Sequence, residues 1–136
     1  MIQFHELRVG DLVLVEFGGQ RNEGEVVGLN GADREINVET EVQAFWYGPN
    51  DLFPIPLDEG QLLKFGFEKQ AQADGTVKYL KGPFRILLSQ PGNFSQFEMW
   101  YREDRRHIHE PLSVHQLQNH YHQMTKVDLT RGVNAH

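Results

Sequence analysis

Short runs of apolar and alternating residues, separated by glycine-rich turns, dominate the first third of the chain. β-branched and aromatic residues favour strands, and Gly-Gly or Asn-Gly pairs favour the tight turns that join them. The pattern predicts strands at residues 12–17, 25–29, 35–39 and 43–47. Several short strands in so short a stretch are typical of a strongly bent sheet, so we expect an SH3-like, barrel-like sheet over residues 1–57.

A short helix is predicted immediately after this sheet. Asp58 can cap its first turn, and Gln61 occupies the capping-box position three residues later. Gly66 is suited to the left-handed residue that ends a helix. The apolar side of this helix is expected to consist of Leu62, Leu63 and Phe65.

The next apolar runs predict an antiparallel meander, with strands at residues 67–69, 77–80, 84–88 and 94–101. In the last of these strands, side-chain alternation puts Phe97, Met99 and Tyr101 on one face and Trp100 on the other. The charged run at residues 102–106 follows this strand, and we interpret it as a loop.

A helix near the C-terminus is the clearest element of the sequence. Ser113 is a favourable N-cap, and Gln116, three residues later, completes a capping box. One stripe at helical spacing carries Val114, Leu117, Tyr121 and Met124, which predicts a buried side. The opposite side, interpreted as solvated, carries His115, Gln118, Asn119 and His122.

Together these elements predict an α+β fold: a barrel-like N-terminal sheet, a short helix, an antiparallel meander and a C-terminal helix. We expect a single domain over residues 1–129, with the barrel-like strands in residues 1–57 and the remaining elements in residues 58–129. Residues 130–136 have little to bury and are predicted to form a flexible tail.

Composition and charge narrow the functional classes. The 136 residues include no Cys, which excludes disulfides, thiolate zinc sites and cysteine nucleophiles and fits a reducing cytoplasm. No apolar run approaches the roughly 20 residues that cross a bilayer, so we expect no membrane association. The formal net charge of −6 makes the chain a poor general binder of phosphate backbones, unless cations gather locally.

The histidines are the first chemical candidates, and five of them gather near the C-terminus: His107, His109, His115, His120 and His122. In a strand, His107 and His109 would share a face, which is a usable metal geometry if a carboxylate such as Glu103 or Glu110 converges on them. In a helix, the pair formed by residues 120 and 122 points about 200° apart and cannot chelate. We interpret these side chains as solvated, and expect no metal site and no cofactor.

Aromatic residues beside cations are the second candidate. The sequence carries no nucleophile elbow, Walker loop or dinucleotide fingerprint, so no residue is expected to be catalytic. Aromatic rings next to cations can stack bases or hold acidic peptides. The predicted ligand-binding residues are Trp46, Trp100, Arg105 and Arg106. The alternative interpretation is that these residues are core aromatics and a charged hairpin tip.

Three strings along the chain resemble a family of small uncharacterised proteins from bacteria and their phages. They are residues 6–15 (ELRVGDLVLV), 54–69 (PIPLDEGQLLKFGFEK) and 114–125 (VHQLQNHYHQMT). The family motifs within the last two are Pro54-Ile55-Pro56-Leu57, Leu62-Leu63-Lys64-Phe65-Gly66-Phe67-Glu68 and Val114-His115-Gln116-Leu117-Gln118-Asn119-His120-Tyr121. The resemblance extends from about Glu6 to Leu129, and His120 and His122 stand where family members carry apolar residues. It implies no activity or cofactor, and it suggests an accessory protein that acts on a host factor.

The hypothesis that follows is a non-enzymatic binding module that contacts a protein partner or a second copy of itself. A second hypothesis is a nucleic-acid or nucleotide binder that uses residues 100–107. A third is a metalloenzyme built on His107 and His109.

Overall fold

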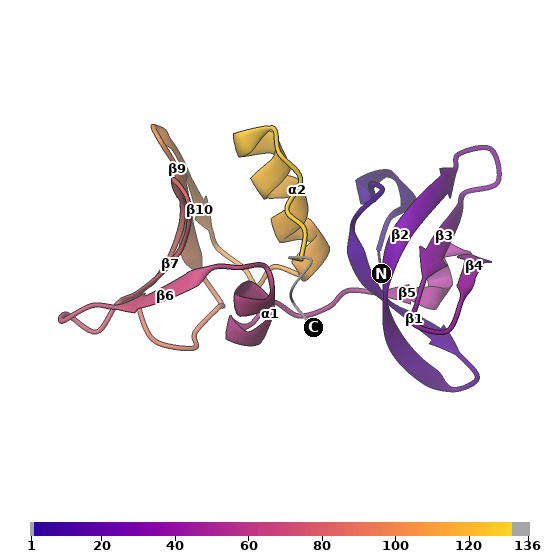
Figure 1. Cartoon of the computed structure of the whole chain (residues 1–136), viewed down its shortest axis with the longest axis horizontal. Coiled ribbons are helices and arrows are strands. Elements are labelled where there is room, and N and C mark those ends of the chain that lie inside the picture. The colour runs from indigo at the N-terminus through magenta and orange to yellow at the C-terminus, as the bar shows by residue number, and fades with distance from the viewer. Residues whose placement is uncertain (1, 132–136) are drawn as a thin grey trace. The chain divides into compact units, whose positions relative to one another are not determined.

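The computed structural model describes residues 2–131 and divides the chain into two compact units. The first consists of residues 1–55 and 113–119, and the second of residues 56–112 and 120–136. Each unit holds one antiparallel sheet of five strands, and α2 (Val114–Thr125) contributes residues to both (Figure 1). The predicted α+β fold, with its barrel-like sheet, short helix, meander and C-terminal helix, is confirmed.

The sheet of the first unit has the strand order β4-β3-β2-β1-β5. Its elements are η1 (Phe4–Glu6), β1 (Leu12–Phe17), β2 (Gln20–Asn30), β3 (Glu35–Glu39), β4 (Ala44–Tyr47), η2 (Pro49–Asp51) and β5 (Leu52–Phe53). The predicted strands are present, and β2 is longer than expected because its polar first half pairs with β1. The turn between β1 and β2 uses Gly18 and Gly19 at φ of 62° and 80°, where a side chain would be strained.

One face of this sheet forms the core of the first unit. Val13 and Val15 alternate with more exposed neighbours along β1, as expected for a strand with one buried face. A bulge between Val26 and Gly28 shifts the register of β2 against β3. The buried core residues are Ile2, Leu7, Val13, Val15, Val26, Ile36, Val38 and Leu52.

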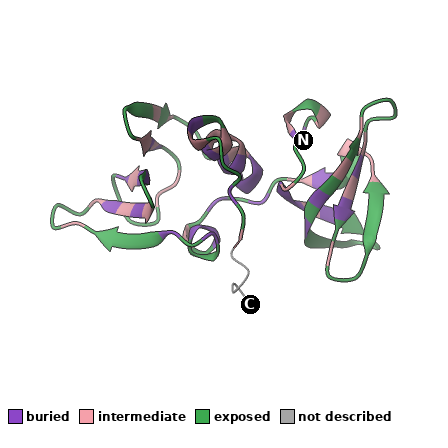
Figure 2. Ribbon diagram, turned by 45° about the horizontal axis from the view of Figure 1, so that its top comes forward, coloured by how far each residue is buried: buried purple, intermediate pink, exposed green. Residues whose placement is uncertain are grey.

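The second unit is a meander in which every strand pairs with its neighbours in sequence, in the order β10-β9-β8-β7-β6. Its elements are α1 (Glu59–Lys64), β6 (Glu68–Ala71), β7 (Val77–Lys81), β8 (Phe84–Leu88), β9 (Phe97–Tyr101) and β10 (Asp104–Ile108). Strand β6 is exposed along its whole length (Figure 2). The Asp58 carboxylate accepts a hydrogen bond from the Gln61 backbone N–H, which confirms the predicted cap.

Two sequence predictions for this unit are wrong. Leu63, expected on the buried side of α1, is 48% exposed, because the buried side of the helix carries Gln61, Leu62 and Phe65 instead. The charged run at residues 102–106 is not a loop: Arg102 and Glu103 form a two-residue turn, and the rest begins β10. Its strand character comes from pairing with β9, which the polar composition of the run does not reveal.

Two of the four residues on the predicted solvated side of α2, His115 and Gln118, are buried, and Asn119 and His122 are partly buried, which corrects the prediction of a solvated polar face. The apolar stripe is buried as expected, and so are His115 and Gln118. The Gln118 side chain accepts a hydrogen bond from Leu12 N–H at 2.8 Å and donates one to the Gly10 carbonyl at 2.9 Å. The polar side of the helix is therefore buried because it satisfies backbone groups of the first unit.

The segment after Leu129 is bonded to the second unit through Arg131. Arg131 donates a hydrogen bond to Gln61 Oε1 at 2.6 Å, so the predicted flexible tail does not begin directly after Leu129. Residues 132–136, the rest of that predicted tail, lie outside the described residues. In the described part of the chain, neither α1 nor α2 has the length and apolar composition of a membrane-spanning helix.

Candidate functional site

The outer face of the meander carries a group of cations around one tryptophan. Strand pairing places Arg85 directly opposite Trp100, and Trp100 directly opposite Arg105, so the three side chains share a face on neighbouring strands. Their sequence neighbours Ile86 and Met99 point into the core. We call this surface the cationic face; its residues are Lys78, Leu80, Arg85, Leu87, Trp100 and Arg105, and strand pairing places the carboxylates of Glu68 and Glu98 on the same side, at its margins.

Trp100 and Arg105 are in direct contact. The Arg105 guanidinium carbon lies 4.1 Å from the centre of the Trp100 ring, which is a cation–π geometry. The Trp100 Nε1 has no hydrogen-bond partner, but it is buried, so a ligand on this face would meet the indole ring and the guanidinium rather than the indole donor.

A pocket of about 260 Å³ lies on the same strands, next to the row of opposed residues Arg85, Trp100 and Arg105. The adjacent row joins Leu87, Glu98 and His107, which are opposed across β8, β9 and β10. Glu98 Oε1 lies 3.2 Å from His107 Nε2, and the rings of His107 and His109 stack with centroids 6.1 Å apart. The pocket is lined by Thr76, Leu87, Ser89, Gln96, Phe97, Glu98, His107, Ile108 and His109. It is large enough for one side chain or small ring of a ligand.

The predicted metal geometry is met only in part. His107 and His109 do lie together, but the carboxylate beside them is Glu98 rather than Glu103 or Glu110. Among residues 2–131 there is no group of three or more histidine and acidic side chains that could hold a metal ion.

The remaining predicted binding residues lie elsewhere. Arg106 is opposed to the buried Met99, and it bonds to α2 through His120 Nδ1 and Gln123 Oε1, both at 2.8 Å. Trp46 belongs to the first unit, where it is 50% exposed on β4. The cationic face therefore contains two of the four predicted residues. Sequence reasoning missed Arg85, although the alternation of residues 84–88 already places it opposite the core.

Two histidines of α2 occupy environments that disfavour their charged forms. Burial lowers the pKa of His115, only partly opposed by the Glu6 carboxylate, whose Oε1 lies 3.6 Å from the His115 Nε2. Burial, together with the Arg106 charge, lowers the pKa of His120. The Ser113 hydroxyl lies 3.0 Å from the His115 Nδ1. These contacts hold neutral imidazoles, so the interpretation of His115 as solvated is wrong.

We expect the protein to lose stability as the pH falls below about 6.5, the pKa of an unfolded histidine. Below this value the unfolded chain binds protons at residues 115 and 120 that the folded chain does not bind. The free energy of unfolding should therefore fall with pH by up to about 1.4 kcal/mol per unit for each histidine. Urea denaturation at a series of pH values between 5 and 8 measures this slope.

The variant His115→Asn should flatten this dependence, because it removes one of the two buried imidazoles that the unfolded chain protonates first. Equal slopes for the unsubstituted protein and His115→Asn would contradict the assignment of a neutral His115.

Comparison of the chain with protein-family models, curated proteins and solved structures finds no match.

Proposed function

We propose that this protein is a non-enzymatic binding module that holds an acidic, partly apolar segment of a partner protein on the cationic face. The observation that carries the proposal is the Arg105 guanidinium stacked on Trp100, with Arg85 opposed to Trp100 on the other neighbouring strand, β8. Such an arrangement offers positive charge and an aromatic surface in one place. A segment with carboxylates and aromatic side chains would use both.

The second candidate function is binding of single-stranded nucleic acid or a nucleotide by the same face. The aromatic surface of Trp100 supports it, because every base can stack on an indole while phosphates contact neighbouring cations. The net charge of −6 is the argument against it, since long-range repulsion opposes a polyanion.

Fluorescence anisotropy with two labelled probes tests both functions. One probe is a ten-residue peptide of alternating glutamate and tyrosine, and the other is a ten-nucleotide oligothymidylate. We expect the peptide to bind, and Trp100→Ala or Arg105→Gln to weaken binding about fivefold. Tighter binding of the oligothymidylate, with the same dependence on residue 100, would instead favour the second candidate.

The matched control is Lys64→Gln, which removes one positive charge from an exposed position on α1. Binding that Lys64→Gln weakens as much as Arg105→Gln would reflect total charge and would refute the cationic face as the site. Failure of both probes to bind would refute both candidate functions.

Three finer assignments belong to this proposal. The strand order of the first unit, with a 3-10 turn between β4 and β5, supports an SH3-like barrel. The three resembling sequence strings support a bacterial or phage accessory protein acting on a host factor. The cysteine-free sequence supports a cytoplasmic location.

A further inference from the structure

The outer face of the first unit's sheet carries the opposite charge. Strand pairing places Glu25 directly opposite Glu39, and Glu23 lies two residues before Glu25 on the same side of β2. Glu35, opposed to Asn30, lies further along the same side of β3. We call this surface the acidic face; its residues are Glu23, Glu25, Val27, Glu35, Asn37, Glu39 and Trp46.

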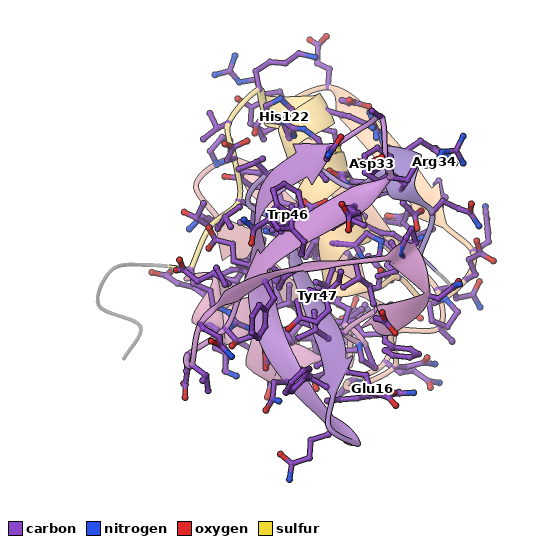
Figure 3. The ribbon with its side chains drawn as sticks, turned by 90° about the vertical axis from the view of Figure 1, so that its right-hand side faces the viewer. Glu16, Asp33, Arg34, Trp46, Tyr47 and His122 are labelled. Atoms are coloured by element: carbon purple, nitrogen blue, oxygen red, sulfur yellow. The ribbon has the colours of Figure 1, made fainter. Side chains whose placement is uncertain are left out.

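A tryptophan lies on this face as well. Trp46 is opposed to Asn37 on β3, and its ring reaches over to β2: an added Cβ at Gly28 would lie 3.5 Å from it, at ordinary van der Waals distance. The indole therefore lies beside the bulge of β2. Figure 3 shows Trp46 in front of the strands, with Glu16 toward one end of the sheet and Asp33 and Arg34 toward the other. Half of the Trp46 surface nevertheless remains exposed, as does 38% of Val27.

The charges of this face oppose folding. Carboxylates directly opposite each other on neighbouring strands, as Glu25 and Glu39 are, repel each other. The cation that strand pairing places on the same side is Arg21, and it is engaged elsewhere: it pairs with Glu16 at 3.4 Å and lies 3.7 Å from the Phe53 ring centre. The repulsion between Glu25 and Glu39 is therefore left for a ligand to relieve.

The exposed groups of the face also favour a cation. Carboxylates and the negative face of an indole both attract ammonium and guanidinium groups. Lysine and arginine add an aliphatic stem that can pack on Trp46 and Val27.

We propose that the acidic face binds a lysine- or arginine-bearing extended segment of a partner protein. Charge complementarity selects this occupant: the same carboxylates repel nucleic acid, and the described residues offer no cluster that could hold a metal ion. The cations of the segment contact Glu25 and Glu39, and their stems cover Trp46. This interaction is separate from the proposed function, because it uses the other unit and a ligand of the opposite charge.

Anisotropy of a labelled ten-residue peptide of alternating lysine and threonine tests this proposal, because alternation puts all lysines on one side of an extended chain. We expect binding that weakens about fivefold in Glu25→Gln/Glu39→Gln and in Trp46→Ala. The matched control is Glu103→Gln/Glu110→Gln, which has the same net charge but changes two exposed residues of the other unit. This control should bind the peptide as tightly as the unsubstituted protein does.

Three outcomes would overturn the proposal: no binding, equal weakening in the two double variants, or self-association of the unsubstituted protein that Glu25→Gln/Glu39→Gln abolishes. The last result, seen by sedimentation, would make the occupant the cationic face of a second copy. Thermal melting of each variant verifies that it is folded. Trp100→Ala and Arg105→Gln should bind the lysine peptide normally, so the acidic face and the cationic face are tested independently.

Discussion

Replacing Leu117 with alanine should lower the free energy of unfolding by about 2–5 kcal/mol. Leu117 lies at the centre of the apolar stripe of α2 and is fully buried, with 0% of its surface exposed. The substitution removes buried methyl groups and leaves a cavity that the surrounding side chains fill only in part. Such a loss is a large fraction of the stability of a domain of this size.

Chemical denaturation measures the effect of Leu117→Ala, and Leu63→Ala provides the matched comparison. Leu63 is a leucine in the other helix, and 48% of its surface is exposed, so its truncation should cost less than about 1 kcal/mol. If Leu117→Ala unfolds at the same denaturant concentration as Leu63→Ala, the buried stripe of α2 is misassigned.

Elements that depend only on residues within a few positions of one another could be predicted from the sequence. The cap at Asp58 depends on a residue three positions away, and the alternation of β1 and β3 is visible in a few letters. The same local logic explains why Phe97 and Met99 were correctly separated from Trp100. Patterns within one turn or one strand are enough for these predictions.

The misassigned elements depend on residues far apart in the sequence. Strand β10 is polar, and its hairpin turn lacks the usual glycine or asparagine; Arg102 takes the positive φ of 57° instead. The buried polar side of α2 bonds to backbone groups more than one hundred residues earlier. No local pattern contains such a partner.

Only part of the cationic face could be predicted from the sequence, because its contacts join residues on different strands. Trp100 and Arg105 are close in sequence, and both were predicted to bind a ligand. Their contact forms because residues 102 and 103 make a two-residue turn, which the charged sequence of this segment does not indicate. Arg106 is adjacent to Arg105 and points the other way, which follows only once residues 104–108 are known to be a strand.

Net charge conceals the distribution of charge in this protein. The value of −6 indicated a chain that avoids anions. Folding instead places Arg85 and Arg105 on either side of Trp100 in one sheet, and Glu25 and Glu39 near Trp46 in the other. Each face can attract its own ligand locally, so the net charge of the whole chain does not predict what either face binds.

Replacing Gln118 with leucine should lower the free energy of unfolding by about 2–4 kcal/mol, although the side chain is nearly the same size. The amide satisfies the Leu12 N–H and the Gly10 carbonyl, and leucine leaves both backbone groups without these bonds. Each buried polar group that loses its partner costs about 1–3 kcal/mol. Gln118 is only 5% exposed, so water has little access to replace the bonds.

Urea denaturation of Gln118→Leu, beside the exposed Gln90→Leu as control, measures this cost. A second variant, Gln118→Glu, separates the two bonds: its carboxylate still accepts from Leu12 N–H but faces the Gly10 carbonyl without a donor. It should be destabilised at neutral pH and should recover part of its stability relative to Gln118→Leu in acid, where the protonated carboxyl donates again. If Gln118→Leu is as stable as the unsubstituted protein, the polar side of α2 does not hold the first unit through these bonds, and its burial needs another explanation.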